Sequence, residues 1–76
     1  MNAPDAVPTV QRALRRYWQR HPHAADTSAG IAKWWLEPPA READVLAALM
    51  DLQLEGSVSP LVAGDGRVRW HWVAQG

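Results

Sequence analysis

The sequence contains no cysteine and no phenylalanine, and its positive and negative charges are equal in number. Without cysteine, neither a disulfide framework nor a cysteine-ligated zinc site can support the hydrophobic core. Lysine plus arginine and aspartate plus glutamate each number 8, so the chain lacks the basic excess that usually marks a nucleic-acid-binding domain. Arguments from charge therefore depend on where the charged residues lie.

Long apolar runs are absent as well, because the longest ones span only a few residues. A membrane-spanning helix needs about 20 consecutive apolar residues. The N-terminal segment MNAPDAVPT lacks the basic start and the apolar stretch of a signal peptide. We therefore expect a cytoplasmic protein with no membrane partner.

The chain has 76 residues, of which 47% are hydrophobic, enough for one domain with a modest core. We expect residues 1–8, which include Pro4 and Pro8, to be a flexible leader, and residues 9–76 to form a single domain. The aromatic residues are mostly tryptophans, and the spacing places four of them in the core: Trp18, Trp35, Trp70 and Trp72.

Hydrophobic periodicity predicts two helices in the first half of the chain. The first is expected to run from an N-cap at Thr9 to about Arg20, with one apolar face and one arginine-rich face. The second is short and is capped by Asp26 or Thr27. Gly30 is expected to weaken it.

A third helix is predicted to have Pro39 in its first turn and to end at Gly56. Its central apolar stripe points inward and consists of Val45, Leu49 and Leu52. Leu46, Met50 and Leu54 widen this apolar arc on one side.

Residues 57–73 carry a β-hairpin pattern, in which Val68, Trp70 and Trp72 alternate with Arg67, Arg69 and His71. The dipeptide Asp65-Gly66 is a strong tight-turn signal. Pro60 argues that the partner strand, about residues 57–62, is short or lies at a sheet edge.

The segments VLAALMDLQLEGSV and GDGRVRWHW, in this order, resemble the winged helix-turn-helix family. That family typically shows a valine, leucines at helical spacing, a glycine and a hairpin with a basic tip. The matching residues are Val45, Leu49, Leu52, Gly56, Val58, Arg67 and Arg69. The resemblance covers roughly residues 9–73 and implies a small α+β, winged-helix-like domain: three helices followed by a two-stranded antiparallel β-hairpin, the wing. It also implies DNA binding, with the third helix in the major groove and the wing on the backbone or in the minor groove.

The side chains favour the wing over the third helix as the DNA contact. The outward side of the third helix is expected to present an acidic, solvated face without the Arg, Lys, Asn or Gln that read bases: Ala40, Ala43, Asp44, Ala47 and Asp51. Arg67, Arg69 and His71 project from one side of their strand toward phosphates, and Arg41 offers another contact. Binding of this kind is nonspecific and salt-sensitive.

Protein contacts are the alternative. We expect Trp34 to be partly exposed beside Leu46 or Met50, so that with Leu54 they form an apolar patch of the kind found at protein interfaces. The arginine face of the first helix would be solvated or would dock an acidic partner through Arg12, Arg15 and Arg16. A molecule that is basic on one side and acidic on another could also self-associate head to tail.

Nothing in the sequence indicates catalysis. His21 and His23 form a weak metal pattern beside a proline and are expected to be ordinary loop residues. We therefore expect no metal, no cofactor, no small-molecule substrate and no enzymatic activity.

Two functions follow from these patterns. The first is a DNA-binding or transcription-associated accessory protein with weak, mainly phosphate-directed contacts from the wing. The second is a protein–protein interaction module on the same scaffold, forming a homodimer or binding another protein without binding DNA. The family resemblance puts DNA binding slightly ahead, whereas the side chains alone favour the second function.

Overall fold

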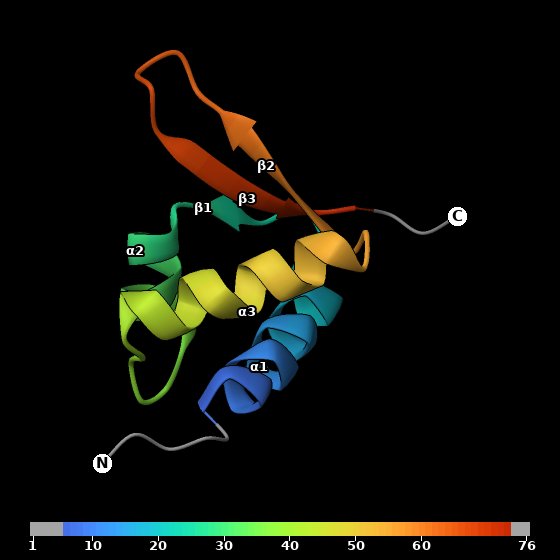
Figure 1. Cartoon of the computed structure of the whole chain (residues 1–76), viewed down its shortest axis with the longest axis vertical. Helices are drawn as coiled ribbons and strands as arrows, with labels where there is room; N and C mark the ends of the chain where they lie inside the picture. Colours follow the sequence, from blue (N-terminus) through green and yellow to red (C-terminus); the bar gives the residue numbers. More distant parts are fainter. Residues whose placement is uncertain (1–5, 74–76) are drawn as a thin grey trace.

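Three helices and a small antiparallel sheet make up the computed structural model, which describes residues 6–73 (Figure 1). Helices α2 and η1 are continuous and together form the second helix, of which η1 is a π-helical segment. The expected α+β fold is confirmed, and its arrangement is compatible with a winged-helix-like domain. In chain order the elements are α1 (Ala6–Arg20), β1 (Ala25–Asp26), α2 (Ser28–Gly30), η1 (Ile31–Trp35), α3 (Glu42–Leu54), β2 (Val58–Val62) and β3 (Val68–Trp72).

Helix α1 begins at Ala6, so the prediction of an N-cap at Thr9 was wrong. Pro8 lies in the first turn, where its missing N–H costs nothing because the first N–H groups of a helix have no partner within it. Residues 6–8 of the expected leader are therefore helical. Residues 1–5 of that leader and residues 74–76 of the expected domain lie outside the described residues.

The second helix begins as predicted, because Thr27 is its N-cap and its side-chain oxygen accepts a 3.1 Å hydrogen bond from the Gly30 N–H. Asp26 accepts a 2.8 Å bond from the Thr27 N–H. Its carboxylate fills the space that a Cβ at Gly30 would occupy. The glycine that weakens this helix is thus required by the packing of Asp26.

Helix α3 starts at Glu42 rather than at Pro39. Pro38 and Pro39 instead belong to the loop before the helix. In this loop the Ala40 N–H donates a 3.1 Å bond to the Ala32 carbonyl. Arg41 precedes the helix with an extended backbone. The helix therefore begins only after the loop, because Ala40 is bonded to the second helix and Arg41 takes the N-cap position.

The predicted end of α3 at Gly56 is confirmed. Gly56 has a φ of +83° and donates to the Gln53 carbonyl at 2.9 Å, while the Ser57 N–H reaches the Leu52 carbonyl at 2.9 Å. These two bonds form a Schellman motif, whose left-handed position favours glycine. The motif turns the chain directly from α3 into β2.

The sheet has the strand order β1-β3-β2, and all pairs are antiparallel. The sequence patterns missed β1, a two-residue strand that pairs Ala25 with His71 and Asp26 with Trp70. Pro60 lies on the edge strand β2, as predicted, opposite Trp70. Ser57 and Ala63 bond to Val73 and Arg67, the residues on either side of β3. This register turns the backbone of Pro60 toward the open edge, where its missing N–H breaks no ladder bond.

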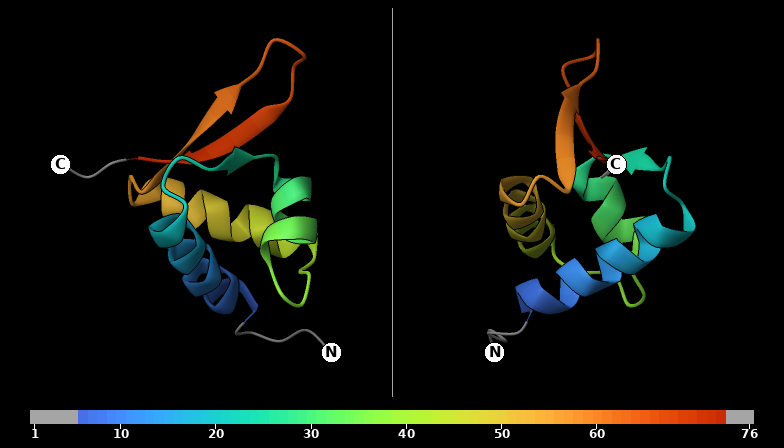
Figure 2. Two further views of the ribbon diagram at one scale, coloured as in Figure 1. Left: turned by 180° about the vertical axis from the view of Figure 1, so that it is seen from behind. Right: turned by 90° about the vertical axis from the view of Figure 1, so that its right-hand side faces the viewer.

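The core lies where α1, the second helix, α3 and the sheet meet (Figure 2). Trp18 is its largest fully buried residue, and its indole N–H donates a 2.9 Å bond to the Ala24 carbonyl. Trp35 packs edge-on against Trp18 and stacks on Tyr17. The inward prediction for α3 is confirmed, since its buried residues include Val45, Leu49 and Leu52.

No helix within residues 6–73 is both long and apolar enough to cross a membrane.

Candidate functional site

The outer face of α3 is apolar. At about 100° per residue, four side chains lie within about 40° of the direction opposite Val45, which is buried in the core. We call these four residues the apolar stripe: Ala43, Ala47, Met50 and Leu54. Met50 is 59% exposed and Leu54 is 87% exposed. In the side view of Figure 2, α3 lies at the margin of the molecule, with its outer face turned away from the other elements.

The prediction of an acidic, solvated outer face is confirmed only in part, because Ala43 and Asp51 are exposed whereas Asp44 and Ala47 are half-buried. Glu42, at the start of α3, accepts a 2.8 Å bond from the Ser28 hydroxyl of α2. The other acidic residues lie on the flank toward α1, where Gln11 donates a 3.0 Å bond to Asp51 and Arg15 forms an ion pair with Glu55. Asp44 is half-buried on the same flank. These carboxylates therefore belong to the contact between two helices of the same chain. Ala40, also expected to face outward, is half-buried against the core.

The opposite flank of α3 faces the wing. Leu46 is 37% exposed and lines a groove with Ala29 of α2 and with Val68 and Trp70 of β3. Beyond that groove, Val62 at the end of β2 pairs with Val68, and both are exposed. Apolar surface thus continues from α3 toward the wing.

Trp34 lies on η1 and is 72% exposed, so its predicted exposure is confirmed. The Lys33 ammonium lies 4.8 Å from the centre of its ring. The structure gives Trp34 this neighbour, whereas its expected contact with Leu46 or Met50 stays a prediction.

The arginines of α1 do not form one uniform docking face. Arg15 is engaged with Glu55, whereas Arg12 and Arg16 are exposed. Arg16 lines a hollow beside Tyr17 and Trp35, on another side of α1. Because Arg15 meets Glu55 at the contact between α1 and the end of α3, the expected separation into a basic side and an acidic side is only partial.

The wing presents its basic residues as predicted. Arg67 and Arg69 are exposed and His71 is half-buried. Alternation places Arg69 and His71 on one face of β3, whereas Arg67 immediately precedes the strand and lines the groove with Val68 and Trp70. A carboxylate oxygen of Asp65 lies 3.9 Å from the Nε of Arg67. Arg69 pairs in register with Leu61, which is also exposed. The wing thus offers two accessible guanidinium groups beside an exposed leucine.

Arg41 is exposed but does not join this group. It immediately precedes α3, and that end of the helix lies away from the hairpin tip (Figure 1). A contact between Arg41 and DNA stays a prediction.

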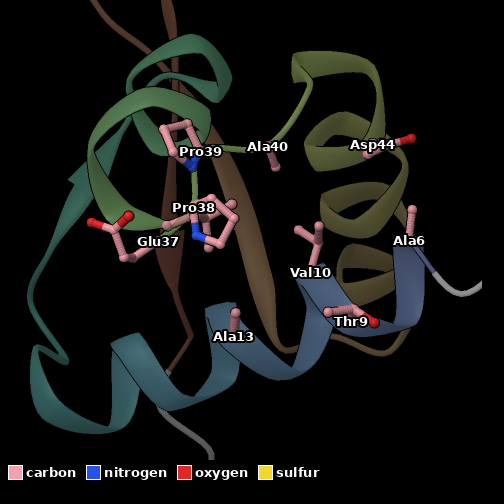
Figure 3. A pocket seen from close by; sticks show the side chains of 10 residues that line it. Ala6, Thr9, Val10, Ala13, Glu37, Pro38, Pro39, Ala40 and Asp44 are labelled. Carbon is pink, nitrogen blue, oxygen red and sulfur yellow. The ribbon is translucent and has the colours of Figure 1, made fainter. Parts of the chain in front are cut away.

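A shallow cleft of about 370 Å³ lies between α1 and the loop before α3 (Figure 3). Its walls are mostly apolar, with Val10 and Ala13 on α1 facing Pro38 and Pro39. Glu37 and Asp44 are its charged lining residues. The sequence analysis did not single out this cleft, because the cleft depends on how the proline loop folds back onto α1.

The part of the chain that the structure describes contains no cluster of metal-ligating side chains. Within residues 6–73 no three side chains of His, Cys, Asp or Glu come together in a way that could hold an ion.

The comparisons with known proteins leave the chain to be judged by its own residues. No protein-family model, no curated protein and no solved structure matches it.

Part of the apolar stripe is predictable from the sequence. The predicted exposure of Leu46, Met50 and Leu54 is confirmed. The sequence analysis joined these residues to Trp34 and did not join Met50 and Leu54 to Ala43 and Ala47. The alternation of those four positions at helical spacing marks a second apolar face, opposite the first. That reading requires knowing that the core covers only part of the arc.

Proposed function

We propose that this protein is a non-enzymatic, cytoplasmic protein–protein interaction module on a winged-helix-like scaffold, which binds its partner through the apolar stripe of α3. The observation that carries the proposal is the exposure of Met50 and Leu54 on the outer face of the helix that occupies the DNA-reading position in winged-helix domains. Large apolar side chains gathered on one exposed face are typical of protein interfaces.

The chemistry of the stripe is unfavourable for DNA. Base readout in the major groove needs hydrogen-bonding side chains, and the stripe carries two alanines, a methionine and a leucine. The neighbouring flank carries Asp44 and Asp51. Their carboxylates would be repelled by the phosphates of DNA. A protein surface that buries the stripe removes apolar area from water instead.

A photo-crosslinking amino acid placed at Met50 tests the proposal in cells that express the protein. The matched control carries the same group at Leu61, an exposed apolar residue on the wing. We expect protein adducts at position 50 well above those at position 61. Equal, low adduct levels at both positions would contradict the proposal.

The second candidate function is nonspecific DNA binding by the wing. It is favoured by the exposure of Arg67 and Arg69 on the hairpin. Two phosphate contacts support only weak binding, with a salt dependence of about two released counterions.

Titration with a random-sequence duplex at low salt separates the two functions. Under the proposed function, amide shifts should stay within noise across the wing and α3. Shifts confined to β2 and β3 that vanish at moderate salt, and that are lost when Arg67→Ala and Arg69→Ala are combined, would instead establish the DNA function.

A further inference from the structure

The spacing of the apolar stripe is the same in both directions along α3. Its residues follow one another at steps of four, three and four positions, the a/d spacing of helices that pack side by side. The first two, Ala43 and Ala47, are small, and the last two, Met50 and Leu54, are large. A second helix of the same sequence running antiparallel would place a large side chain opposite each small one.

We infer that the apolar stripe is a homodimer interface, in which α3 of one protomer packs antiparallel against α3 of a second copy about a two-fold axis. This inference rests on the proposed function and names its partner. In this register Ala43 lies opposite the partner's Leu54, and Ala47 lies opposite the partner's Met50. The same patch then serves both protomers, as two-fold symmetry requires.

Side-chain volume selects the antiparallel direction. Parallel helices in register would place alanine against alanine at one end of the stripe and leucine against leucine at the other. The first pair leaves a gap and the second holds the helices apart, whereas close packing favours small residues against large ones. The antiparallel pair fills every layer evenly.

Charge permits this pairing and predicts how salt affects it. The net charge of the chain is zero, so two copies meet without overall repulsion. At the interface, the flank that carries Asp44 and Asp51 faces the same flank of the partner. Gln11 holds Asp51 toward α1 of its own chain. Salt screens the remaining repulsion between carboxylates, so added salt should maintain or strengthen the dimer.

The interface is small. A single pair of helices four layers long falls short of the roughly 1,200–2,000 Å² that stable complexes bury. We therefore expect a dimer that dissociates on dilution, with monomer and dimer both populated between micromolar and millimolar concentrations.

Sedimentation equilibrium over that concentration range is the first test. The unmodified chain should show a monomer–dimer equilibrium that persists or tightens at high salt. Met50→Glu should weaken association by roughly tenfold or more, because it buries a carboxylate among apolar side chains without a partner. Leu61→Glu is the matched control, since it places the same charge on an exposed leucine outside the stripe, and it should associate like the unmodified chain.

Cysteine crosslinking tests the register, and the absence of natural cysteines makes every thiol unambiguous. In the antiparallel dimer two copies of residue 43 lie about 16 Å apart along the helix axis, given about 1.5 Å per residue. A disulfide spans only about 4.4–6.8 Å between Cα atoms. Ala43→Cys alone and Leu54→Cys alone should therefore remain unlinked, whereas a mixture of the two, one with a mass tag, should form the mixed covalent dimer.

The inference would be overturned by a strict monomer at millimolar concentration, by equal association of the Met50→Glu and Leu61→Glu variants, or by efficient crosslinking of Ala43→Cys with itself. Association that weakens steeply with salt would point to head-to-tail pairing of α1 arginines with acidic residues and would overturn it as well. The photo-crosslinking test separates this failure from failure of the proposed function. Adducts at Met50 with a different protein, and none between copies of this chain, would retain the interaction module and reject the homodimer.

Discussion

At the scale of single residues, burial separates the tryptophans into those that support the fold and one that is free to contact other molecules. Trp18 is 1% exposed and Trp34 is 72% exposed. Trp18 also satisfies its indole N–H within the chain, through Ala24. A buried indole with a satisfied donor is the arrangement in which this side chain contributes most to stability.

Replacement of Trp18 by alanine should lower the free energy of unfolding by about 3–5 kcal/mol, through lost burial and the cavity left behind. For a small domain this is a large share of the total stability, so the variant should be mostly unfolded. Urea denaturation followed by circular dichroism measures the change. Trp34→Ala is the control and should cost less than about 1 kcal/mol. Similar losses from both variants would show that burial does not explain the difference.

The effect of Gly30→Ala on the free energy of unfolding should depend on whether Asp26 is present. Alanine normally stabilises a helix interior by about 1 kcal/mol over glycine. Here Gly30→Ala should destabilise the protein, because the added Cβ displaces the Asp26 carboxylate that accepts from the Thr27 N–H. In an Asp26→Ala background the same change should become neutral or stabilising. A double-mutant cycle in urea measures the coupling, and additive effects would contradict the steric explanation.

At the scale of elements, the contact between α1 and α3 explains why α3 carries acid along one flank. Gln11 and Arg15 of α1 reach across to Asp51 and Glu55 of α3. This contact leaves the apolar stripe as the unpaired side of the helix. The carboxylates that argue against DNA binding therefore have a role within the fold.

The Arg15–Glu55 pair should contribute little to stability, since its side chains are 38% and 51% exposed. Exposed ion pairs are usually worth about 0.2–1 kcal/mol and are screened by salt. We expect Arg15→Gln to lower the free energy of unfolding within that range at low salt, and by less at high salt. Thermal or urea unfolding at two ionic strengths measures both values. A loss that is large and independent of salt would place the pair among the groups that stabilise the core.

At the scale of the whole molecule, the inferred dimer links stability to concentration. Partner binding to the folded state alone raises apparent stability by mass action. The melting temperature of the unmodified chain should therefore rise with protein concentration. Differential scanning calorimetry measures this rise, which Met50→Glu should abolish and Leu61→Glu should leave unchanged.

A melting temperature that is independent of concentration for all three chains would contradict the link between dimerisation and stability. A rise shared by all three would place the contact somewhere other than the apolar stripe. Both outcomes are distinct from a simple loss of folding, which would appear as a low melting temperature of the Met50→Glu variant at every concentration.

Local sequence patterns were sufficient to predict most of the helices and strands and the residues of each that face the core. Spacing along the chain identified the inward residues of α3, the cap at Thr27, the end at Gly56 and the alternating strand β3. Helix periodicity and strand alternation are properties of short segments, so they can be read without the rest of the molecule. The start of α3 and the two-residue strand β1 were missed, because both depend on contacts with distant segments.

The sequence by itself determined that α3 would be apolar over a wide arc and acidic on one flank. Only the tertiary structure decided what each part of that arc does. Helix α1 crosses on the acidic flank and the wing on the other, so Val45, Leu49 and Leu52 become core while Met50 and Leu54 remain exposed. Periodicity fixes the angles between side chains around a helix but not the direction from which its neighbours approach. Because of that direction, the outer side of α3 carries an exposed apolar stripe where an acidic, solvated face was expected.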